Sequence, residues 1–349
     1  MQISALAEPL TALVEAGVRQ RIFPGAAWAV GTLEHGVTGA AGRRAPASDA
    51  MRADTLFDIA SLTKIISIWS LVGKLVRCKR LRLDDRLDSL LPGTAGYALA
   101  PVTVFQLLTH TAGLPLRARL RASYGDVRAD IVRGVLREPL QGVPGQAVEY
   151  TDRAALILGF VIERLLAMPL EQALEEQVLR PLGMAATRFG PLAPPHDQLA
   201  APTEYCDVAG AHLCGTVHDF SARLLGGVSG ISGLFSSAPD LQRFLRAVLA
   251  ASTGQGQPGG VFDAGWVRDS LTVQTGSLQP ARGLFWHPAA GTAPQDDIWC
   301  HLGFTGTAMW LSPRRGRYSV LLTNKLYYTR DSTSINALRR DFLRCAFAC

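Results

Sequence analysis

The chain has 349 residues, of which 48% are apolar and 18% are charged, with 34 glycines and 20 prolines. This composition excludes intrinsic disorder, collagen and coiled coil, because so apolar a chain buries a large core. The 35 Lys and Arg residues exceed the 29 Asp and Glu residues and give a net charge of +6, but they form no clear cluster. We therefore expect no nucleic-acid partner.

Strand and helix patterns distinguish the two ends of the chain from its middle. Helical apolar spacing at residues 5–19 is followed by strand-like stretches at residues 25–31 and 37–42. Helical segments dominate the middle; they are residues 61–79, 102–108, 126–137, 152–166, 170–179 and 238–249. Strand patterns return late, at residues 283–287, 305–311 and 317–323, with a turn at residues 312–316. A last helix is predicted at residues 333–347.

Strands at both ends with helices between them predict an α+β fold that occupies residues 1–349 as a single unit. We expect an antiparallel sheet in an α/β sandwich from residues 1–58 and 280–349, with a mainly helical part from residues 59–279. Clefts form where two such parts meet, so the junction is the expected position of a site.

The sequence predicts neither an export signal nor a membrane span. The first basic residue is Arg19, and acidic residues interrupt the opening stretch, which does not fit a signal peptide. The apolar stretches at residues 65–76 and 154–162 are shorter than the roughly 20 residues that a membrane helix requires. Six cysteines without an export signal are typical of reduced thiols, so we expect a cytoplasmic protein with no membrane partner.

Cys206, His212, Cys214 and His218 lie close together in the sequence without the spacing of a zinc site. Structural zinc favours two cysteines two to four residues apart, and these two are farther apart. The glycine-rich residues 226–233 match no nucleotide-binding pattern and are interpreted as a flexible turn. We expect no metal and no cofactor.

Ser61 and Lys64 are the strongest candidates for catalysis. At the start of a helix, a three-residue spacing places the hydroxyl and the ammonium on one face. The helix N-terminus also favours the anionic character of an attacking alkoxide. The chain has only four lysines, and this one has apolar neighbours that a solvated lysine does not need. A neutral Lys64 accepts the serine proton if burial lowers its pKa.

Around this motif the sequence resembles the serine β-lactamase and penicillin-binding-protein-like superfamily, specifically the class C β-lactamase and related esterase branch. The resemblance covers nearly the whole chain, because seven matching segments follow in family order. They are FDIASLTK at 57–64, LRLDD at 81–85 with LP at 91–92, LLTHTAGL at 107–114, YTD at 150–152, PLGM at 181–184, GLFSSAPDL at 233–241 and HLGFTGT at 301–307.

The resemblance implies a β-lactamase/transpeptidase-like fold and assigns roles to five residues. Ser61 is the acylated nucleophile, and Lys64 is either its proton acceptor or the cation that lowers the pKa of Tyr150. Tyr150 shuttles protons, and the choice of base between these two residues stays open. The N–H groups of Ser61 and Phe304 form the oxyanion hole. Gly303 lies on the motif strand and belongs to the substrate-binding residues.

Two departures from the family pattern bear on the substrate. Asp152 stands where antibiotic-hydrolysing members carry Asn. If Asp152 lies near Lys64, it raises the pKa of the lysine and shifts base catalysis toward Tyr150. The alternatives are that Asp152 meets a cationic group of the substrate or caps the helix that begins there. His301 and Leu302 replace Lys-Thr. His301 titrates near neutrality, and it binds substrate, relays protons to Tyr150 or is a satisfied histidine at a strand end. Leu302 lacks a hydroxyl for a carboxylate, so we expect substrates with little negative charge there.

The sequence therefore predicts a serine hydrolase that forms an acyl-enzyme on Ser61 with a small ester, amide or peptide-like substrate. The alternatives are an acyltransferase with the same acyl-enzyme, a β-lactamase or D-peptidase, and a non-catalytic ligand-binding homologue. An α/β-hydrolase is disfavoured because the pattern around Ser229 fails at the last position of Gly-x-Ser-x-Gly. His110 and His218 are predicted to be structural, because the motif supplies its own base. No oligomeric state is predicted.

Overall fold

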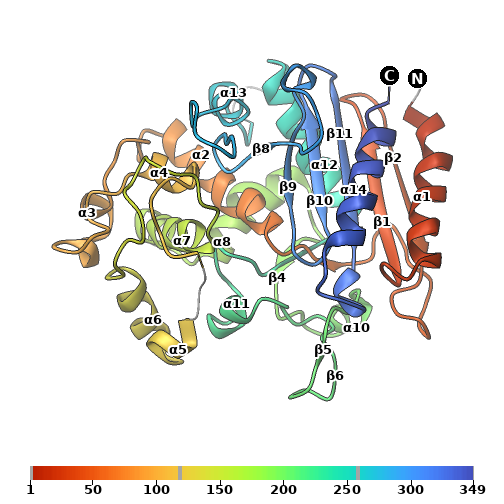
Figure 1. The fold of residues 1–349 in the computed structure, drawn as a ribbon, viewed down its shortest axis with the longest axis horizontal. Helices are drawn as coiled ribbons and strands as arrows, with labels where there is room; N and C mark the ends of the chain where they lie inside the picture. Colours follow the sequence, from red (N-terminus) through yellow and green to blue (C-terminus); the bar gives the residue numbers. More distant parts are fainter. Residues whose placement is uncertain (1–2, 117–119, 257–259, 349) are drawn as a thin grey trace.

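Six antiparallel strands from the two ends of the chain form the main sheet (Figure 1). The computed structural model describes residues 3–116, 120–256 and 260–348. The strands are β1 (Gly25–Gly31), β2 (Gly36–Gly42), β8 (His287–Pro288), β9 (Trp299–Leu302), β10 (Ala308–Ser312) and β11 (Arg317–Thr323). Their order is β2-β1-β11-β10-β9-β8, so the first strand of the chain pairs with the last. The predicted sheet from both ends is confirmed.

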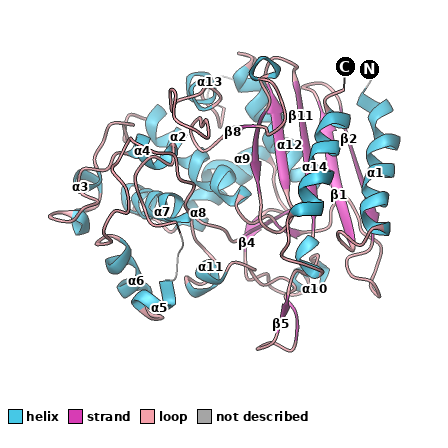
Figure 2. Cartoon of the chain, viewed as in Figure 1, coloured by secondary structure: helices cyan, strands magenta, loops and turns pink. Residues whose placement is uncertain are grey.

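Helices cover both faces of this sheet (Figure 2). Trp28 of β1 belongs to an outer apolar cluster with α1 (Ala7–Arg19) and α14 (Thr333–Ala346). The next residue, Ala29, belongs to the inner cluster, which includes α12 (Ala238–Ser252). Successive side chains of a strand point to opposite faces, so a strand that is apolar on both sides requires two covering layers. The helix α12 thus contributes the inner layer of the sheet, although it comes from the mainly helical middle of the chain.

The middle of the chain folds into helices beside the sheet (Figure 1). The helices are α2 (Ser70–Arg77), α3 (Leu87–Leu90), α4 (Val104–Leu108), α5 (Leu120–Tyr124), α6 (Arg128–Val135), α7 (Asp152–Leu166), α8 (Leu170–Leu174), α9 (Arg180–Leu182), α10 (His196–Leu199), α11 (Phe220–Leu224) and α13 (Ala264–Ser270). Two small sheets accompany them. One has the order β3 (Phe57–Asp58), β7 (Leu234–Ser236) and β4 (Arg188–Phe189), and the other pairs β5 (Tyr205–Cys206) with β6 (Ala211–His212). No helix in the described ranges has the length and apolarity needed to cross a membrane.

The helix α7 forms the centre of the helical part, with the bounds that the sequence predicts. The Thr151 side chain caps its start by accepting a hydrogen bond from the N–H of Arg153 at 3.2 Å. The apolar run that follows is buried, and the helix ends where Ala167 takes a left-handed conformation with φ of 54°. Arg153 and Glu138 form a buried ion pair at 2.6 Å, which attaches the start of α7 to the segment before it.

The predicted strand at residues 283–287 is wrong. Only His287 of that stretch is paired in the sheet, as the first residue of β8. Phe285 instead takes a φ of 63° and donates its N–H to the carbonyl of Leu108 at 2.7 Å, and its ring is fully buried in the inner cluster. The apolar residues that suggested a strand therefore bury themselves in the helical part, because a short apolar run fits either environment.

Two further predicted boundaries are displaced, and both lie beside Ser61. The strand predicted at residues 305–311 begins only at Ala308, because the preceding residues form the turn between β9 and β10. The helix predicted from Ser61 starts at Leu62 and contains a π-helical segment, Lys64–Trp69, before α2. π-Helical turns are rare and occur frequently at functional sites.

Candidate active site

Ser61 lies at the turn between β3 and the π-helical segment, and it is half-buried. The preceding residue, Ala60, has a left-handed φ of 46°. The buried carboxylate of Asp58 holds this turn by accepting hydrogen bonds from the N–H of Ala60 at 2.8 Å and from the N–H of His218 at 2.7 Å. A backbone strained in this way at a partly exposed serine is typical of functional sites.

Lys64 reaches Ser61 from the next helical turn, as the three-residue spacing predicts. Its Nζ donates to Ser61 Oγ at 2.9 Å and to the carbonyl of Ile231 at 2.8 Å. The same nitrogen forms an ion pair with Asp152 Oδ1 at 2.7 Å. Each of these three partners is an acceptor for the ammonium group, whose side chain is fully buried.

The charge state of Lys64 follows from these contacts. Burial by itself lowers the pKa of Lys64, but the charge of Asp152, the charge of Tyr150 and hydrogen bonds with both raise it, and the result lies above the ordinary value. Lys64 is therefore an ammonium at neutral pH. The prediction that Asp152 raises this pKa is confirmed, whereas the neutral lysine considered as a base does not fit the geometry. Thr151, not Asp152, caps the helix.

Tyr150 lies among cations and histidines beside this pair. Lys64 Nζ is 5.4 Å from the centroid of its ring, and Arg282 Cζ is 5.6 Å from it. The ring of His110 is centred 4.7 Å away and that of His301 6.2 Å away. Tyr150 therefore lies beside the partner of Ser61, in a position that suits a group that takes up and releases a proton.

His301 is buried and neutral, which corrects the expectation that it titrates near neutrality. Burial lowers its pKa well below the ordinary value, and the positive charges of its surroundings, including His287 and Lys64, lower it further. Neither ring nitrogen has a hydrogen-bond partner in the described part of the chain. A neutral imidazole with two unused nitrogens is available to a substrate or to a water molecule near Tyr150.

Leu302 and Gly303, the next two residues of this motif, face different layers. The Leu302 side chain packs with the outer apolar cluster, on the sheet face away from Ser61. The expectation that its missing hydroxyl affects substrate recognition therefore does not fit the structure. Gly303 lies against the nucleophile turn, with the side chain of Ala60 and the carbonyl of Ile59 beside its Cα. Gly303 and His301 therefore form the part of the motif on the Ser61 side.

The loop after β9 brings a second free N–H toward the serine turn. Thr305 Oγ1 donates to the carbonyl of Asp58 at 2.8 Å, and Thr307 Oγ1 donates to that of Ile59 at 3.1 Å. Among the described residues, the N–H groups of Ser61 and Phe304 donate to no acceptor. Two unused donors on segments tied together in this way match the arrangement that stabilises an oxyanion.

Gly303 is a position that we expect not to tolerate a side chain. A Cβ atom there would lie 2.0 Å from Thr307 Oγ1 and 2.7 Å from the carbonyl oxygen of Ile59. We expect Gly303→Ala to displace the loop and to lower kcat/KM for an ester by roughly tenfold to 100-fold, because a shift of about 1 Å at a catalytic group has effects of this size.

Steady-state kinetics and a thermal unfolding midpoint measure this effect, with Gly142→Ala as the matched control. A Cβ at Gly142 has its nearest neighbour at 3.6 Å, an ordinary contact. Normal activity of Gly303→Ala contradicts a fixed loop.

The Phe304 side chain is 48% exposed and stands next to the candidate oxyanion donor. It stacks on the ring of His218 with centroids 5.8 Å apart, and Lys325 Nζ lies 5.2 Å from its centroid on another segment. His218 in turn pairs with Glu204 at 2.8 Å. Hydrogen bonds from Arg330 and His218 lower the pKa of Glu204 to about 2, although burial alone would raise it. His218 thus supports the wall of the site, as a structural histidine.

Residues 10–344 match the family model described as Beta-lactamase. The chain belongs to the beta-lactamase family. It is 30% identical over 305 residues to a protein of Escherichia coli (strain K12) provisionally named D-alanyl-D-alanine carboxypeptidase, a match that covers 78% of this chain and 69% of the relative. This membership, together with the fold, makes the chain a serine hydrolase with a β-lactamase/transpeptidase-like architecture.

Solved structures give the same fold. The structure of SurE is 25% identical with a TM-score of 0.77, and the match covers 99% of this chain and 77% of that one. The structure of EstCE1, a hydrolase with promiscuous acyltransferase activity, is 19% identical with a TM-score of 0.76, and the match covers 97% of this chain and 98% of that one. The β-lactamase-like fold expected from the sequence is confirmed.

Several residues of this beta-lactamase-family site carry no signal in the sequence. Ile231 contributes only its carbonyl, and the glycine-rich segment around it, interpreted as a flexible turn, is in fact packed: a Cβ at Gly230 would lie 2.1 Å from the carbonyl oxygen of Ala155. Arg282 lies next to the Tyr150 ring and His287 next to the His301 ring; Arg282 directly precedes the stretch that the sequence assigns to a strand, and His287 is its last residue. Their positions depend on chain folding that no local pattern encodes.

The four residues resembling a metal site have other partners in this beta-lactamase-family chain. His212 stacks on Tyr327 with ring centroids 3.8 Å apart, and Cys214 Sγ donates to the carbonyl of Asp197. Among the described residues, no group of three His, Cys, Asp or Glu side chains is arranged to hold a metal ion.

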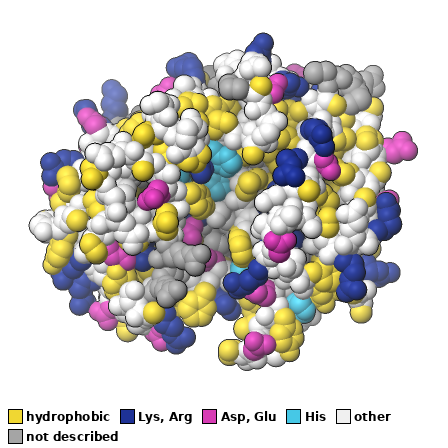
Figure 3. All heavy atoms as spheres, in the orientation of Figure 1, with side chains coloured by type: hydrophobic (Ala, Val, Ile, Leu, Met, Phe, Trp, Pro, Cys, Tyr) yellow, Lys and Arg dark blue, Asp and Glu magenta, His cyan; other side chains and the backbone are white. Residues whose placement is uncertain are grey.

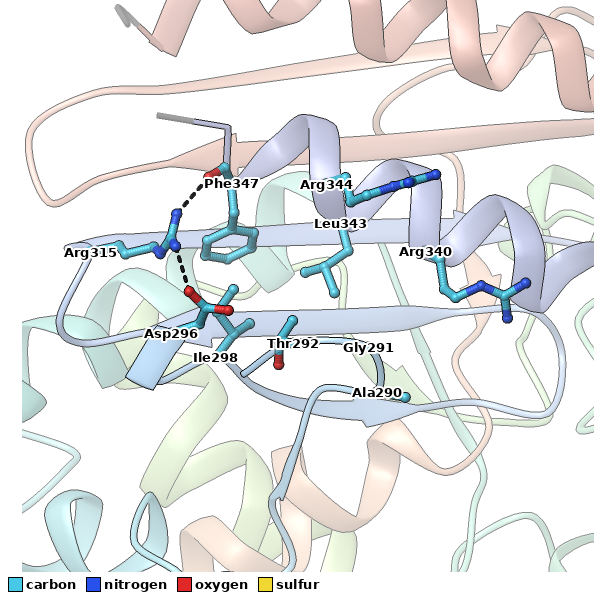
Figure 4. Close-up of a pocket in the computed structure, with 10 residues that line it drawn as sticks. All are labelled: Ala290, Gly291, Thr292, Asp296, Ile298, Arg315, Arg340, Leu343, Arg344 and Phe347. Carbon is cyan, nitrogen blue, oxygen red and sulfur yellow. Dashed lines mark hydrogen bonds and ion pairs between the residues drawn. The ribbon is translucent and has the colours of Figure 1, made fainter. Parts of the chain in front are cut away.

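Two hollows are visible on the molecule. Figure 3 shows histidine and acidic side chains gathered where the surface is hollowed between the helical part and the sheet. The second hollow, of about 360 Å³, lies beside α14 in the outer layer (Figure 4). Arg315 closes one end of it through Asp296 and the carbonyl of Phe347. Its lining has no serine or lysine, so this second hollow is separate from the Ser61 and Lys64 pair.

Proposed function

We propose that this chain hydrolyses small esters, amides or peptide-like substrates through an acyl-enzyme on Ser61. The observation that carries the proposal is the contact of 2.9 Å between the buried Lys64 ammonium and Ser61 Oγ. In the first step Ser61 Oγ bonds to the substrate carbonyl carbon, and the bond to the leaving alcohol or amine breaks. In the second step water attacks the same carbon, the acid leaves, and Oγ regains its proton.

In this mechanism Tyr150 moves the protons and Lys64 remains a cation. Tyr150 takes the proton of Ser61 and passes it to the leaving group, and it then takes a proton from water and returns one to Ser61. Lys64 and Arg282 place positive charge beside the Tyr150 ring throughout these steps. The oxyanion of each tetrahedral intermediate accepts hydrogen bonds from the N–H groups of Ser61 and Phe304.

The charge around the site supports substrates without a carboxylate next to the reacting carbonyl. His301 is neutral where antibiotic-hydrolysing members have lysine. We expect short-chain p-nitrophenyl esters to be turned over with a kcat/KM at least about 100-fold higher than a chromogenic cephalosporin, because a missing charged partner costs about 3 kcal/mol or more in recognition.

Parallel kinetics with both substrates, and with a D-alanyl-D-alanine peptide, measure this difference. Ser61→Ala gives the background rate for each. Efficient cephalosporin turnover contradicts the substrate assignment, and it makes Arg282 the first candidate for binding the carboxylate, since its Cζ lies 5.6 Å from the Tyr150 ring.

Acyl transfer is a second candidate that uses the same acyl-enzyme. The half-exposed ring of Phe304 beside the candidate oxyanion donor offers an apolar surface for an acceptor alcohol. A fold neighbour is named for promiscuous acyltransferase activity. Product analysis with added butanol separates the two functions, because transfer yields a butyl ester and hydrolysis yields the free acid.

A further inference from the structure

A buried arginine without an acidic partner lies behind the loop that carries Phe304. Arg339 of α14 is 8% exposed, and no described carboxylate forms an ion pair with it. Its Nη2 donates to the carbonyl of Gly303 at 2.7 Å and to that of Thr307 at 2.8 Å, while Nη1 donates to Asn336 Oδ1 at 3.0 Å. Burial lowers the pKa of Arg339 to about 10, so the side chain is still charged at neutral pH.

One of these carbonyls belongs to the same peptide group as the candidate oxyanion donor. The peptide between Gly303 and Phe304 consists of the Gly303 carbonyl and the Phe304 N–H. The cis peptides among the described residues all precede proline, so this peptide is trans. In a trans peptide the C=O and the N–H point in opposite directions. When Arg339 holds the carbonyl on the α14 side, it turns the N–H toward the Ser61 side.

The loop carbonyls do not need Arg339 to be satisfied. The N–H of Gly306 donates to the Gly303 carbonyl at 3.1 Å, and the N–H of Gly303 donates to the Thr307 carbonyl at 2.7 Å. The guanidinium therefore adds a second, charged donor to carbonyls that already have one. A charged donor at a carbonyl polarises the whole peptide group and strengthens its N–H as a donor.

We propose that Arg339 is a positioning residue that orients and polarises the Gly303–Phe304 peptide for oxyanion stabilisation. This proposal rests on the proposed acyl-enzyme at Ser61. Arg339 touches neither the substrate nor Ser61; it acts through the peptide between them. The polar contacts of one residue on the outer layer thus extend to the reacting carbonyl on the inner side of the sheet.

Arg339→Met tests the proposal, because it removes the charge and keeps an unbranched chain of similar length. The side chain borders a cavity of about 200 Å³ with Cys300 and Trp310, so an apolar replacement has room. Arg340→Met is the matched control: Arg340 is the next residue of α14, is exposed, and makes no hydrogen bond to the loop within the described chain. Arg339→Lys keeps a charged donor.

The measurement compares an ester with its thionoester analogue, whose sulfur is a poor hydrogen-bond acceptor. Loss of one oxyanion donor costs about 100-fold to 1,000-fold in kcat. For a misoriented donor we expect Arg339→Met to lower kcat on the oxygen ester by roughly 10-fold to 100-fold, with KM nearly unchanged and with little effect on the thionoester. The ratio of kcat on the oxygen ester to kcat on the thionoester is expected to recover partly in Arg339→Lys. In Arg340→Met this ratio is expected to equal that of the wild type.

The outcomes separate this proposal from the function on which it rests. If Ser61→Ala retains the ester turnover of the wild type, the acyl-enzyme is refuted and the positioning role with it. If turnover requires Ser61 and the oxygen-to-sulfur ratio of Arg339→Met equals that of the wild type, only the positioning role is refuted. If Arg339→Met does not fold, as a thermal unfolding scan shows, the ratio of Arg339→Lys decides: a reduced ratio supports the proposal and an unchanged one overturns it.

Discussion

Ser61→Ala is expected to abolish ester turnover and covalent labelling by a fluorophosphonate. We expect kcat/KM to fall at least about 1,000-fold, because loss of a nucleophile in enzymes of this kind leaves only what binding and the oxyanion donors contribute. Intact-mass spectrometry reads the labelling directly: the wild type gains one phosphonyl adduct and the variant gains none. The same experiment with p-nitrophenyl acetate tests for an acetyl adduct.

The structure indicates that this variant folds normally. Lys64 keeps its ion pair with Asp152 and its hydrogen bond to the Ile231 carbonyl when Ser61 Oγ is removed. The unfolding midpoint is therefore expected to stay close to that of the wild type. Ser89→Ala, at an exposed serine in the helical part, is the matched control and should keep both labelling and turnover. A labelled Ser61→Ala protein would place the nucleophile elsewhere.

Lys64→Met is expected to abolish turnover as well, and in addition to destabilise the fold. Removal of the ammonium takes away the cation beside Tyr150 and the donor to Ser61 Oγ, so we expect kcat/KM to fall at least about 1,000-fold. It also leaves the Asp152 carboxylate, whose side chain is 33% exposed, without its ion-pair partner. Unpaired, partly buried charges are costly, so the unfolding midpoint should drop.

A double variant separates these two effects. Lys64→Met combined with Asp152→Asn removes the unpaired charge, so we expect it to regain most of the lost unfolding midpoint and none of the activity. Lys74→Met, one of the three other lysines and located in α2, is the matched control and should stay active. If the double variant regains turnover, the role of Lys64 is structural and its contact with Ser61 has no part in catalysis.

The pH dependence of this stability has a defined sign. The pKa of Lys64 is raised in the folded protein above the unfolded value of about 10.4, so its contribution to the free energy of unfolding is fully present below that pH and is lost as the pH rises through the folded value. Denaturant unfolding should thus show the same deficit for Lys64→Met at pH 6 and at pH 9. A deficit that disappears toward pH 9 would indicate a lysine that titrates near neutrality.

The parts of the fold that the sequence predicts well are those with long, regular patterns. The helix at residues 152–166 and the strand at residues 317–323 have the predicted bounds, because period and capping signals agree over many residues. The stretch at residues 283–287 fails, because a short run with three large apolar residues suits a strand and a buried loop equally. The start of β10 fails because residues 305–307 form hydrogen bonds with the nucleophile turn instead of the sheet.

Some residues of the candidate site are predicted by the sequence and others are not. Helical geometry alone places Lys64 beside Ser61, and the family resemblance adds Tyr150 and Phe304. Arg282 and Arg339 had no signal, because each acts from a segment far along the chain. Arginines are common in this sequence, and nothing local distinguishes a buried one from a surface one.

By itself, the sequence determined the sheet from both ends of the chain, the family, and the serine and lysine pair, because periodicity and short spacings act within a few residues. Only the tertiary structure decided which groups carry charge. Lys64 remains an ammonium because Asp152 comes to within 2.7 Å of it, and His301 is neutral because the surrounding segments bury it among cations. Solvation and charge pairing depend on what packs around a group, and packing is set by the whole chain.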